Sequence, residues 1–266
     1  MLELKHISYA VREGDSELGI LNDISLTIDD HRLVVFTGPN GGGKTTLAKI
    51  IMGLVKPTGG QILWNGQDIT DLGITERARL GIGMSFQRPP TIHGLPTGKL
   101  VELCGRGREM DIPAMARKVH FDQFLDRDVN AGFSGGEIKR SELLQLMAQR
   151  PDLLLFDEPE SGVDLENMAL VGNTVRQLLD GVPDACSATL RERERRRSTS
   201  GLIITHTGHI LEYVNAHRGQ VMYHGKLCCE ARPREILDHI ANHGYQECLR
   251  CLAGDMYGKI AEAPLV

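Results

Sequence analysis

An apolar run, a glycine-rich turn and a helix-like stretch follow one another in Leu33-Val34-Val35-Phe36-Thr37-Gly38-Pro39-Asn40-Gly41-Gly42-Gly43-Lys44-Thr45-Thr46. Glycines let successive backbone N–H groups turn toward an anion without Cβ clashes, and a helix N-terminus adds partial positive charge. The pattern is that of a P-loop, in which the lysine contacts nucleotide phosphates and the next hydroxyl binds Mg²⁺. We therefore expect nucleotide to bind at Gly38, Pro39, Asn40, Gly41, Gly42, Gly43, Lys44, Thr45 and Thr46, with Thr45 as a metal ligand.

Composition limits the kind of protein that carries this loop. The chain has 266 residues, 41% of them hydrophobic, and a formal net charge of −5 at pH 7. This is enough for one large domain over 1–266, and the negative balance does not favour nucleic acid as a partner. No stretch approaches the roughly 18 apolar residues of a membrane span, and Met1 leads into a strand-like segment without a signal-peptide pattern. We expect a cytoplasmic protein without a membrane span.

Short apolar runs predict the centre of the fold. Residues 33–37, 153–156 and 202–205 lack period-2 alternation, as expected of strands that are buried on both faces of a mostly parallel sheet. Asn65-Gly66 and His224-Gly225 each follow a strand-like run and predict two-residue hairpin turns, which indicates antiparallel edge sheets. The sequence therefore predicts an α/β fold with a P-loop core, a mostly parallel sheet and an antiparallel edge sheet.

Two segments depart from this pattern. Residues 88–133 contain four prolines around helix-like pieces at 99–104 and 115–119, which indicates a small helical subdomain within the nucleotide-binding domain. Residues 181–200 are polar and arginine-rich. We interpret them as a solvated surface insertion, with a patch for an anionic partner as the alternative. A C-terminal segment follows over 226–266.

Two acidic residues end the second buried run. Asp157 and Glu158 follow Leu153-Leu154-Leu155-Phe156, at the sheet edge where open α/β sheets bind ligands. Phosphoryl transfer needs charge neutralisation and an oriented nucleophile. This Walker B arrangement therefore predicts that Asp157 holds Mg²⁺, directly or through water, and that Glu158 polarises the attacking water.

Phe133-Ser134-Gly135-Gly136-Glu137 precedes a run with apolar residues at helical spacing. A capped helix would explain the serine and glycines, but the stretch also resembles the signature motif of ATP-binding cassette (ABC) ATPases. In that family the motif reaches the γ-phosphate of ATP held by the opposite subunit. The resemblance implies an ATP-dependent homodimer with MgATP at its interface, and it places Ser134, Gly135, Gly136 and Glu137 among the nucleotide-binding residues.

Three further family motifs occur in order. Gln87 resembles the Q-loop residue, Asp164 ends a D-loop-like Ser161-Gly162-Val163-Asp164, and His206 occupies the place of the switch histidine. The resemblance implies that Glu158, His206 and Gln87 are catalytic in ATP hydrolysis. It also implies that Gln87 senses Mg²⁺ and that Asp164 lies at the nucleotide.

Two features depart from the family pattern. Val11 stands where many cassettes stack adenine on an aromatic residue, with Tyr9 on the same face of the strand, so we expect weak base recognition by Val11. The spacing from Glu158 to His206 is also longer than usual, and the arginine-rich insertion accounts for the excess.

The residues within two of these motifs favour one branch of the family. Phe133-Ser134-Gly135-Gly136-Glu137-Ile138-Lys139-Arg140 with Glu158-Pro159-Glu160-Ser161-Gly162-Val163-Asp164 resembles SufC, the ATPase family of iron–sulfur cluster assembly. This implies a SufB/SufD-like scaffold protein gripped by the helical subdomain, where Ile92 and Leu95 could dock a partner helix. The alternative is the cytosolic ATP-binding subunit of an ABC transporter. Cassettes of translation or nucleic-acid repair are less favoured, because neither a second cassette nor a long coiled-coil insertion is present.

Four cysteines near the C-terminus suggest one further site. Cys228, Cys229, Cys248 and Cys251 could supply soft ligands to zinc or an iron–sulfur cluster if the segment folds back. The spacing matches no standard metal motif. We therefore favour buried, unligated thiols.

Overall fold

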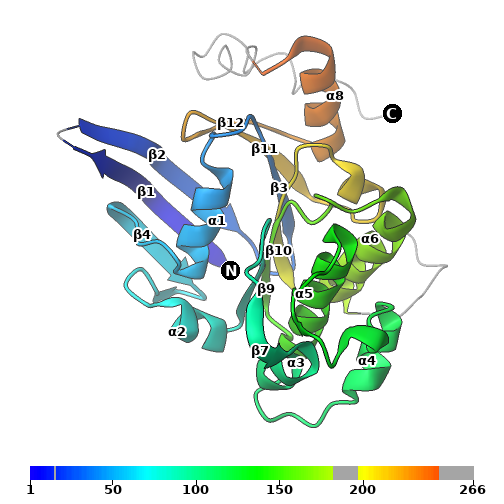
Figure 1. Ribbon diagram of the computed structural model, residues 1–266. Helices are drawn as coiled ribbons and strands as arrows, with labels where there is room; N and C mark the ends of the chain where they lie inside the picture. Colours follow the sequence, from blue (N-terminus) through cyan, green and yellow to red (C-terminus); the bar gives the residue numbers. More distant parts are fainter. Residues whose placement is uncertain (15, 182–196, 246–266) are drawn as a thin grey trace.

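The computed structural model describes residues 1–14, 16–181 and 197–245 (Figure 1). Its centre is a six-stranded sheet in the order β12-β11-β3-β10-β9-β6, in which only β12 runs antiparallel to its neighbour. The strands are β3 (Leu33–Thr37), β6 (Ile82–Ser85), β9 (Leu153–Asp157), β10 (Ser200–Ile204), β11 (Arg218–Tyr223) and β12 (Lys226–Ala231). Every residue of β3, β6, β9 and β10 is buried, as their continuous apolar character predicts.

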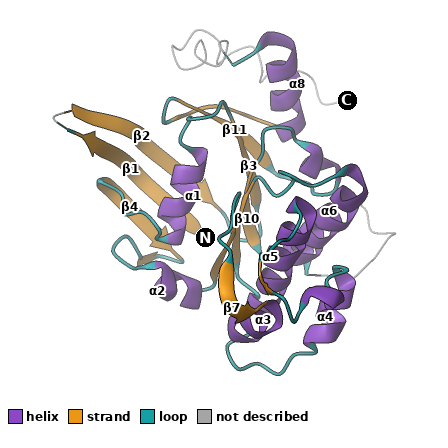
Figure 2. Cartoon of the chain, in the orientation of Figure 1, coloured by secondary structure: helices purple, strands orange, loops and turns teal. Residues whose placement is uncertain are grey.

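A second, antiparallel sheet lies beside the central one (Figure 2). Its order is β2-β1-β4-β5, with β1 (Leu2–Glu13), β2 (Ser16–Ile28), β4 (Gly59–Trp64) and β5 (Gln67–Asp68). Helix α1 (Lys44–Met52) packs between the two sheets, because one apolar cluster joins its residues to both of them. The helix that follows the P-loop is thereby fixed on two sides.

Helices cover the other face of the central sheet. The long helices α5 (Gly135–Gln149) and α6 (Leu165–Asp180) share a second apolar cluster with alternate residues of β3, β9 and β10. The short helix η2 (His209–Glu212) contributes to the same cluster, while α8 (Pro233–His243) packs on β11 and β12. The sheet is therefore buried between α1 on one face and α5 and α6 on the other.

Residues 88–133 contain β7 (Ile92–Pro96), α3 (Thr97–Cys104), α4 (Ile112–Lys118), η1 (Asp122–Phe124) and β8 (Asp128–Val129). Their apolar side chains form a separate cluster around Phe121 and Phe124, which also takes in Leu144 and Ala148 of α5. The two expected helices are present as α3 and α4, and α5 connects them to the central sheet.

The predicted strands and turns are confirmed. The three apolar runs form β3, β9 and β10, and both hairpin turns have positive φ at their two central residues: 51° at Asn65, 79° at Gly66, 46° at His224 and 71° at Gly225. One detail differs from the expected separate edge sheets. Strand β11 pairs in parallel with β3, so the later hairpin extends the central sheet and only β12 is antiparallel there.

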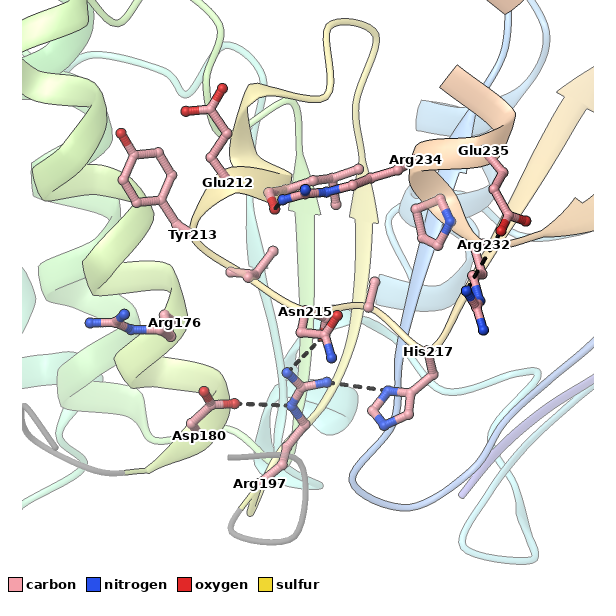
Figure 3. Close-up of a pocket in the computed structure, with 14 residues that line it drawn as sticks. Arg176, Asp180, Arg197, Glu212, Tyr213, Asn215, His217, Arg232, Arg234 and Glu235 are labelled. Atoms are coloured by element: carbon pink, nitrogen blue, oxygen red, sulfur yellow. Dashed lines mark hydrogen bonds and ion pairs between the residues drawn. The ribbon is translucent and has the colours of Figure 1, made fainter. Parts of the chain in front are cut away.

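The arginine-rich segment proves shorter at its C-terminal end than the sequence indicates. Residues 182–196 lie outside the described residues, but Arg197 is only 5% exposed and β10 already begins at Ser200. Arg197 Nε donates to Asp180 Oδ1 over 3.1 Å, and another nitrogen of its guanidinium donates to the carbonyl oxygen of Asn215 over 3.0 Å (Figure 3). Arg197, Thr199 and Ser200 are therefore buried and do not belong to a solvated insertion, while Ser198 between them is exposed.

The expected C-terminal segment is described only as far as residue 245, where it forms β12 and α8. Within the described ranges, no helix has both the length and the apolar character needed to cross a bilayer.

Arg77, on α2 (Ile74–Arg79), is 1% exposed and closes the end of α1. Its guanidinium donates to the carbonyl oxygens of Ile50 and Ile51 over 2.6 and 2.9 Å, and to those of Leu72 and Thr70 over 2.9 Å each. The last carbonyl groups of a helix have no partner within the helix. Arg77 therefore satisfies the C-terminus of the helix that begins at the P-loop.

Replacing Arg77 with Met should lower the free energy of unfolding by roughly 3–5 kcal/mol, because two buried and two partly buried carbonyl groups lose a charged donor. Arg79→Met is the matched control, since Arg79 lies on the same helix but is exposed, and its effect should stay within about 0.5 kcal/mol. Urea denaturation of both variants measures the difference. Equal losses would show that Arg77 is not a helix-terminating contact.

Candidate active site

The glycine-rich loop is shaped by its contact with β11. Gly38 has φ 144°, and a Cβ atom added there would lie 2.0 Å from the carbonyl oxygen of Met222. Gly43, the residue before α1, has φ 100°, and its added Cβ would lie 2.6 Å from a methyl carbon of Leu21. Larger residues are therefore excluded at both positions, and the loop follows the strand closely before it turns into the helix.

Lys44 is a buried cation that forms no ion pair with a carboxylate of the described residues. Its Nζ donates to the carbonyl oxygens of Gly38 and Pro39, both over 2.8 Å, and the residue is only 5% exposed. Burial lowers the pKa of Lys44 to about 8, although the carboxylates of Glu158 and Asp157 act in the opposite direction. The site therefore holds a desolvated positive charge that phosphate oxygens would stabilise.

Thr45 and Asp157 join the loop to the end of β9. The Thr45 hydroxyl donates to Asp157 Oδ1 over 3.0 Å, and burial raises the pKa of this carboxyl group. A hydroxyl and a carboxylate are hard oxygen ligands of the kind that Mg²⁺ uses, usually one or two from the protein and the rest from phosphate and water. In the part of the chain that the structure describes, no group of three or more His, Cys, Asp or Glu is arranged so that it could hold a metal ion. These residues therefore fit a magnesium ion held jointly with a nucleotide, but not a metal held by protein alone.

Glu158 receives two contacts that the sequence analysis did not predict. Gln87 Nε2 donates to Glu158 Oε2 over 2.7 Å, and His206 Nε2 lies 2.9 Å from Glu158 Oε1. These three residues follow the ends of β6, β9 and β10, which are neighbours in the parallel sheet. Burial, followed by the charge of Lys44, lowers the pKa of His206, which favours the neutral ring beside the carboxylate. A carboxylate is thus held from both sides beside the buried ammonium.

The signature-like residues lie apart from this constellation. Ser134 and Glu137 form a reciprocal cap at the start of α5, with hydrogen bonds of 3.3 and 2.8 Å. Gly135 packs on the D-loop of its own chain, because an added Cβ would lie 2.2 Å from the carbonyl oxygen of Gly162. Among the described residues, no hydrogen bond joins Ser134 through Glu137 to the loop that precedes α1. Their role at a nucleotide, with that of Gly136, stays a prediction.

Asp164 and Val11 also lie outside the cluster around Glu158. Asp164 is exposed and caps α6 by accepting from the backbone N–H of Asn167 over 2.9 Å. Val11 is 38% exposed on β1, whereas Tyr9 packs against the main apolar cluster. Both assignments to nucleotide binding stay predictions.

Glu160 is a residue that the sequence analysis missed. Its carboxylate accepts hydrogen bonds from the hydroxyl groups of Thr205 and Thr207, which flank the switch histidine, and burial raises its pKa. Its Oε2 is buried and has no partner among the described residues. Thr205 and Thr207 flank His206 in the sequence, and this pair of hydroxyl residues could have indicated a nearby acceptor such as Glu160.

The four-cysteine site cannot be placed as a whole. Cys228 is buried and Cys229 half-buried, while Cys248 and Cys251 lie outside the described residues. A shared metal site stays an untested alternative to unligated thiols.

Comparison with known proteins places these residues in context. The family profile described as ABC transporter matches residues 21–161. An ABC transporter ATP-binding protein of Methanocaldococcus jannaschii is 32% identical over 253 residues, which cover 91% of this chain and 92% of the relative. The probable ATP-dependent transporter ycf16 of Cyanophora paradoxa is 32% identical over 244 residues, which cover 85% and 86%.

Solved structures show the same fold. An ATP-binding cassette in a dimeric post-hydrolysis state with ADP and phosphate superposes with a TM-score of 0.72 at 22% identity, over 87% of this chain and 98% of the other. A nucleotide-free cassette of an ABC transporter superposes with a TM-score of 0.70 at 21% identity, over 95% and 98%. The expected α/β cassette fold is confirmed.

Glu158→Gln should lower the rate of ATP hydrolysis by roughly 10²- to 10⁴-fold, because the amide cannot accept a proton from the attacking water. ATP binding should persist, since the amide keeps the size of the side chain. Phosphate release and calorimetric ATP binding are the measurements, with the exposed Glu212→Gln as the control that keeps the normal rate. Normal hydrolysis by Glu158→Gln would show that another group acts on the water.

The lowered pKa of Lys44 predicts proton uptake on ATP binding. Lys44 loses its proton as the pH rises through about 8, whereas bound phosphates favour the charged form. ATP affinity should therefore fall above this pH, and binding at about pH 9 should take up a proton. Calorimetry in buffers of different ionisation enthalpy measures the uptake. Lys44→Arg, whose side chain stays charged, should abolish it; equal uptake by both proteins would exclude Lys44 as the source.

Proposed function

Because the chain belongs to the ABC transporter family of ATP-binding cassettes, we propose that it is the ATP-hydrolysing subunit of a transporter whose membrane part is a separate chain. The single observation that carries the chemistry is the Gln87–Glu158–His206 contact beside the buried ammonium of Lys44. The transporter assignment is supported by the relatives, which are described as transporter ATP-binding proteins.

The proposed roles follow from the geometry. The loop N–H groups and Lys44 bind the phosphates, while Thr45 and Asp157 would hold Mg²⁺, which neutralises phosphate charge when bound. Glu158 orients the attacking water. Gln87 and His206 hold the Glu158 carboxylate from opposite sides, so a water molecule that binds there meets a fixed acceptor.

We propose further that two copies of the chain close head to tail over two nucleotides. The start of α5 carries N–H groups and a glycine pair suited to phosphate, yet makes no hydrogen bond to the P-loop of its own described chain. A second copy would supply the nucleotide that Ser134, Gly135 and Gly136 bind. Dimeric cassettes among the structural neighbours support this arrangement.

A second candidate function keeps the same chemistry and changes the partner. The signature and D-loop wording resembles SufC, which favours a SufB/SufD-like scaffold of iron–sulfur cluster assembly. The relatives, described as transporter proteins, favour the first candidate over this one. In both, the partner would contact β7, where Ile92 is 38% exposed and Leu95 half-buried.

Affinity purification from the native host separates the two candidates. A transporter subunit should recover a multi-span membrane protein, and only after detergent extraction, because the partner lies in the bilayer. An assembly ATPase should recover a soluble scaffold without detergent. In either case Ile92→Asp with Leu95→Asp should release the partner and leave ATP binding unchanged.

The control for this experiment is Leu18→Asp, which places the same charge on an aliphatic residue that is 54% exposed on β2. It should keep the partner bound. Release by both variants, or by neither, would contradict β7 as the docking surface.

A further inference from the structure

An ion pair lies inside the protein where α5 passes the end of β6. Lys139 and Glu142 are 2% and 4% exposed, and Lys139 Nζ lies 3.5 Å from Glu142 Oε2. Removing two charges from water costs free energy that their mutual attraction repays only with good additional hydrogen bonds. The additional hydrogen bonds of Lys139 and Glu142 therefore indicate which part of the protein the pair stabilises.

Both charged groups bind one short stretch of backbone. Glu142 accepts from the N–H of Phe86 over 2.7 Å and from the hydroxyl of Ser85 over 3.0 Å. Lys139 Nζ donates to the carbonyl oxygen of Phe86 and lies 3.5 Å from that of Gln87. Strand β6 ends at Ser85, so the peptide groups that follow it are no longer paired within the sheet. Lys139 and Glu142 supply the hydrogen bonds of Phe86 instead.

The backbone held in this way leads directly to the Glu158 carboxylate. Gln87 follows Phe86 in the chain, and its side-chain amide donates to Glu158 Oε2 over 2.7 Å. Burial raises the pKa of Glu142, and the charge of Lys139 acts against this rise. Lys139 and Glu142 on α5 therefore fix the backbone at Phe86, and the side chain of the next residue, Gln87, fixes the Glu158 carboxylate.

We propose that Glu142, together with Lys139, is a positioning pair that holds Gln87 against Glu158 and thereby sets the rate of ATP hydrolysis without contributing to nucleotide affinity. Among the described hydrogen bonds, the pair makes none with the P-loop or with the Thr45–Asp157 contact. The charge of Lys139 acts on Asp157, where it opposes the rise in pKa that burial causes. The hydrogen-bonded path from Glu142 to the Glu158 carboxylate passes through Phe86 and Gln87. Because α5 begins at the signature-like residues, the same helix also connects them to Gln87.

Glu142→Gln tests this positioning role. The amide keeps the shape of the side chain but loses the charge that pairs with Lys139. The turnover number should fall about tenfold, while the KM and Kd for ATP stay within about twofold. The double variant Lys139→Met with Glu142→Gln removes both buried charges and should recover much of the thermal stability, but not the turnover number.

Asp180→Asn is the matched control, because Asp180 forms a second buried ion pair with Arg197 (Figure 3). Both residues lie far along the sequence from Gln87. It should lower stability and leave the turnover number of the folded protein unchanged. If Glu142→Gln does not fold, Ser85→Ala removes one hydrogen bond to the same carboxylate and should lower turnover about two- to threefold at unchanged KM.

A double-mutant cycle with Gln87→Ala decides whether Glu142 acts through Gln87. In the Gln87→Ala background, Glu142→Gln should cause no further fall in turnover, because the group that it positions is gone. Additive losses would overturn the proposal. The proposal would also be overturned if Asp180→Asn, at an equal loss of thermal stability, lowered the turnover number as much as Glu142→Gln does. Glu158→Gln in the same assay shows separately whether the hydrolytic assignment itself holds.

Discussion

The site depends on a buried ammonium group whose hydrogen-bond partners, among the described residues, are two backbone carbonyls. Lys44 can be held in this way only if the preceding loop folds back over it, and this requires Gly38 to approach β11 where no Cβ fits. Strand β11 in turn must lie beside β3, which leads into the loop. The strand order of the central sheet and the geometry of the loop therefore depend on each other. Both are needed to bury the Lys44 ammonium group, whose charge phosphate would stabilise further.

Local pattern was sufficient to predict the centre of the fold. Strands β3, β9 and β10 are short, fully apolar and bounded by turn residues, so their burial on both faces could be predicted without knowing their partners. The hairpins were predictable because only a few residue pairs tolerate two positive φ angles in succession. Lys44, Thr45 and Asp157 could be placed for a similar reason, since a P-loop and an acidic strand end carry their chemistry within a few residues.

Contacts between distant segments were not predictable in the same way. Lys139 and Glu142 lie on a helix among apolar residues, and nothing within that helix shows that both bind the backbone near Phe86. Arg197 ends a run of arginines, and composition alone predicts a solvated charge where the fold supplies Asp180. The family resemblance implied that Gln87, Glu158 and His206 are catalytic, but their direct contacts were not predicted, because these depend on which strands are neighbours. Side-chain patterns encode burial, but pairing across the sheet depends on topology.

Glu158 adopts φ 50°, in the left-handed region where side chains other than glycine, asparagine and aspartate are disfavoured. The conformation costs of order 1 kcal/mol, and the surrounding strands must supply it. Glycine or asparagine at this position would relieve the strain, so the substitutions that best stabilise this turn also remove the carboxylate that we propose to act on water. Selection for a more robust fold and selection for turnover therefore act in opposite directions at a single backbone angle. A stabilised, inactive cassette is only one residue away from the working one.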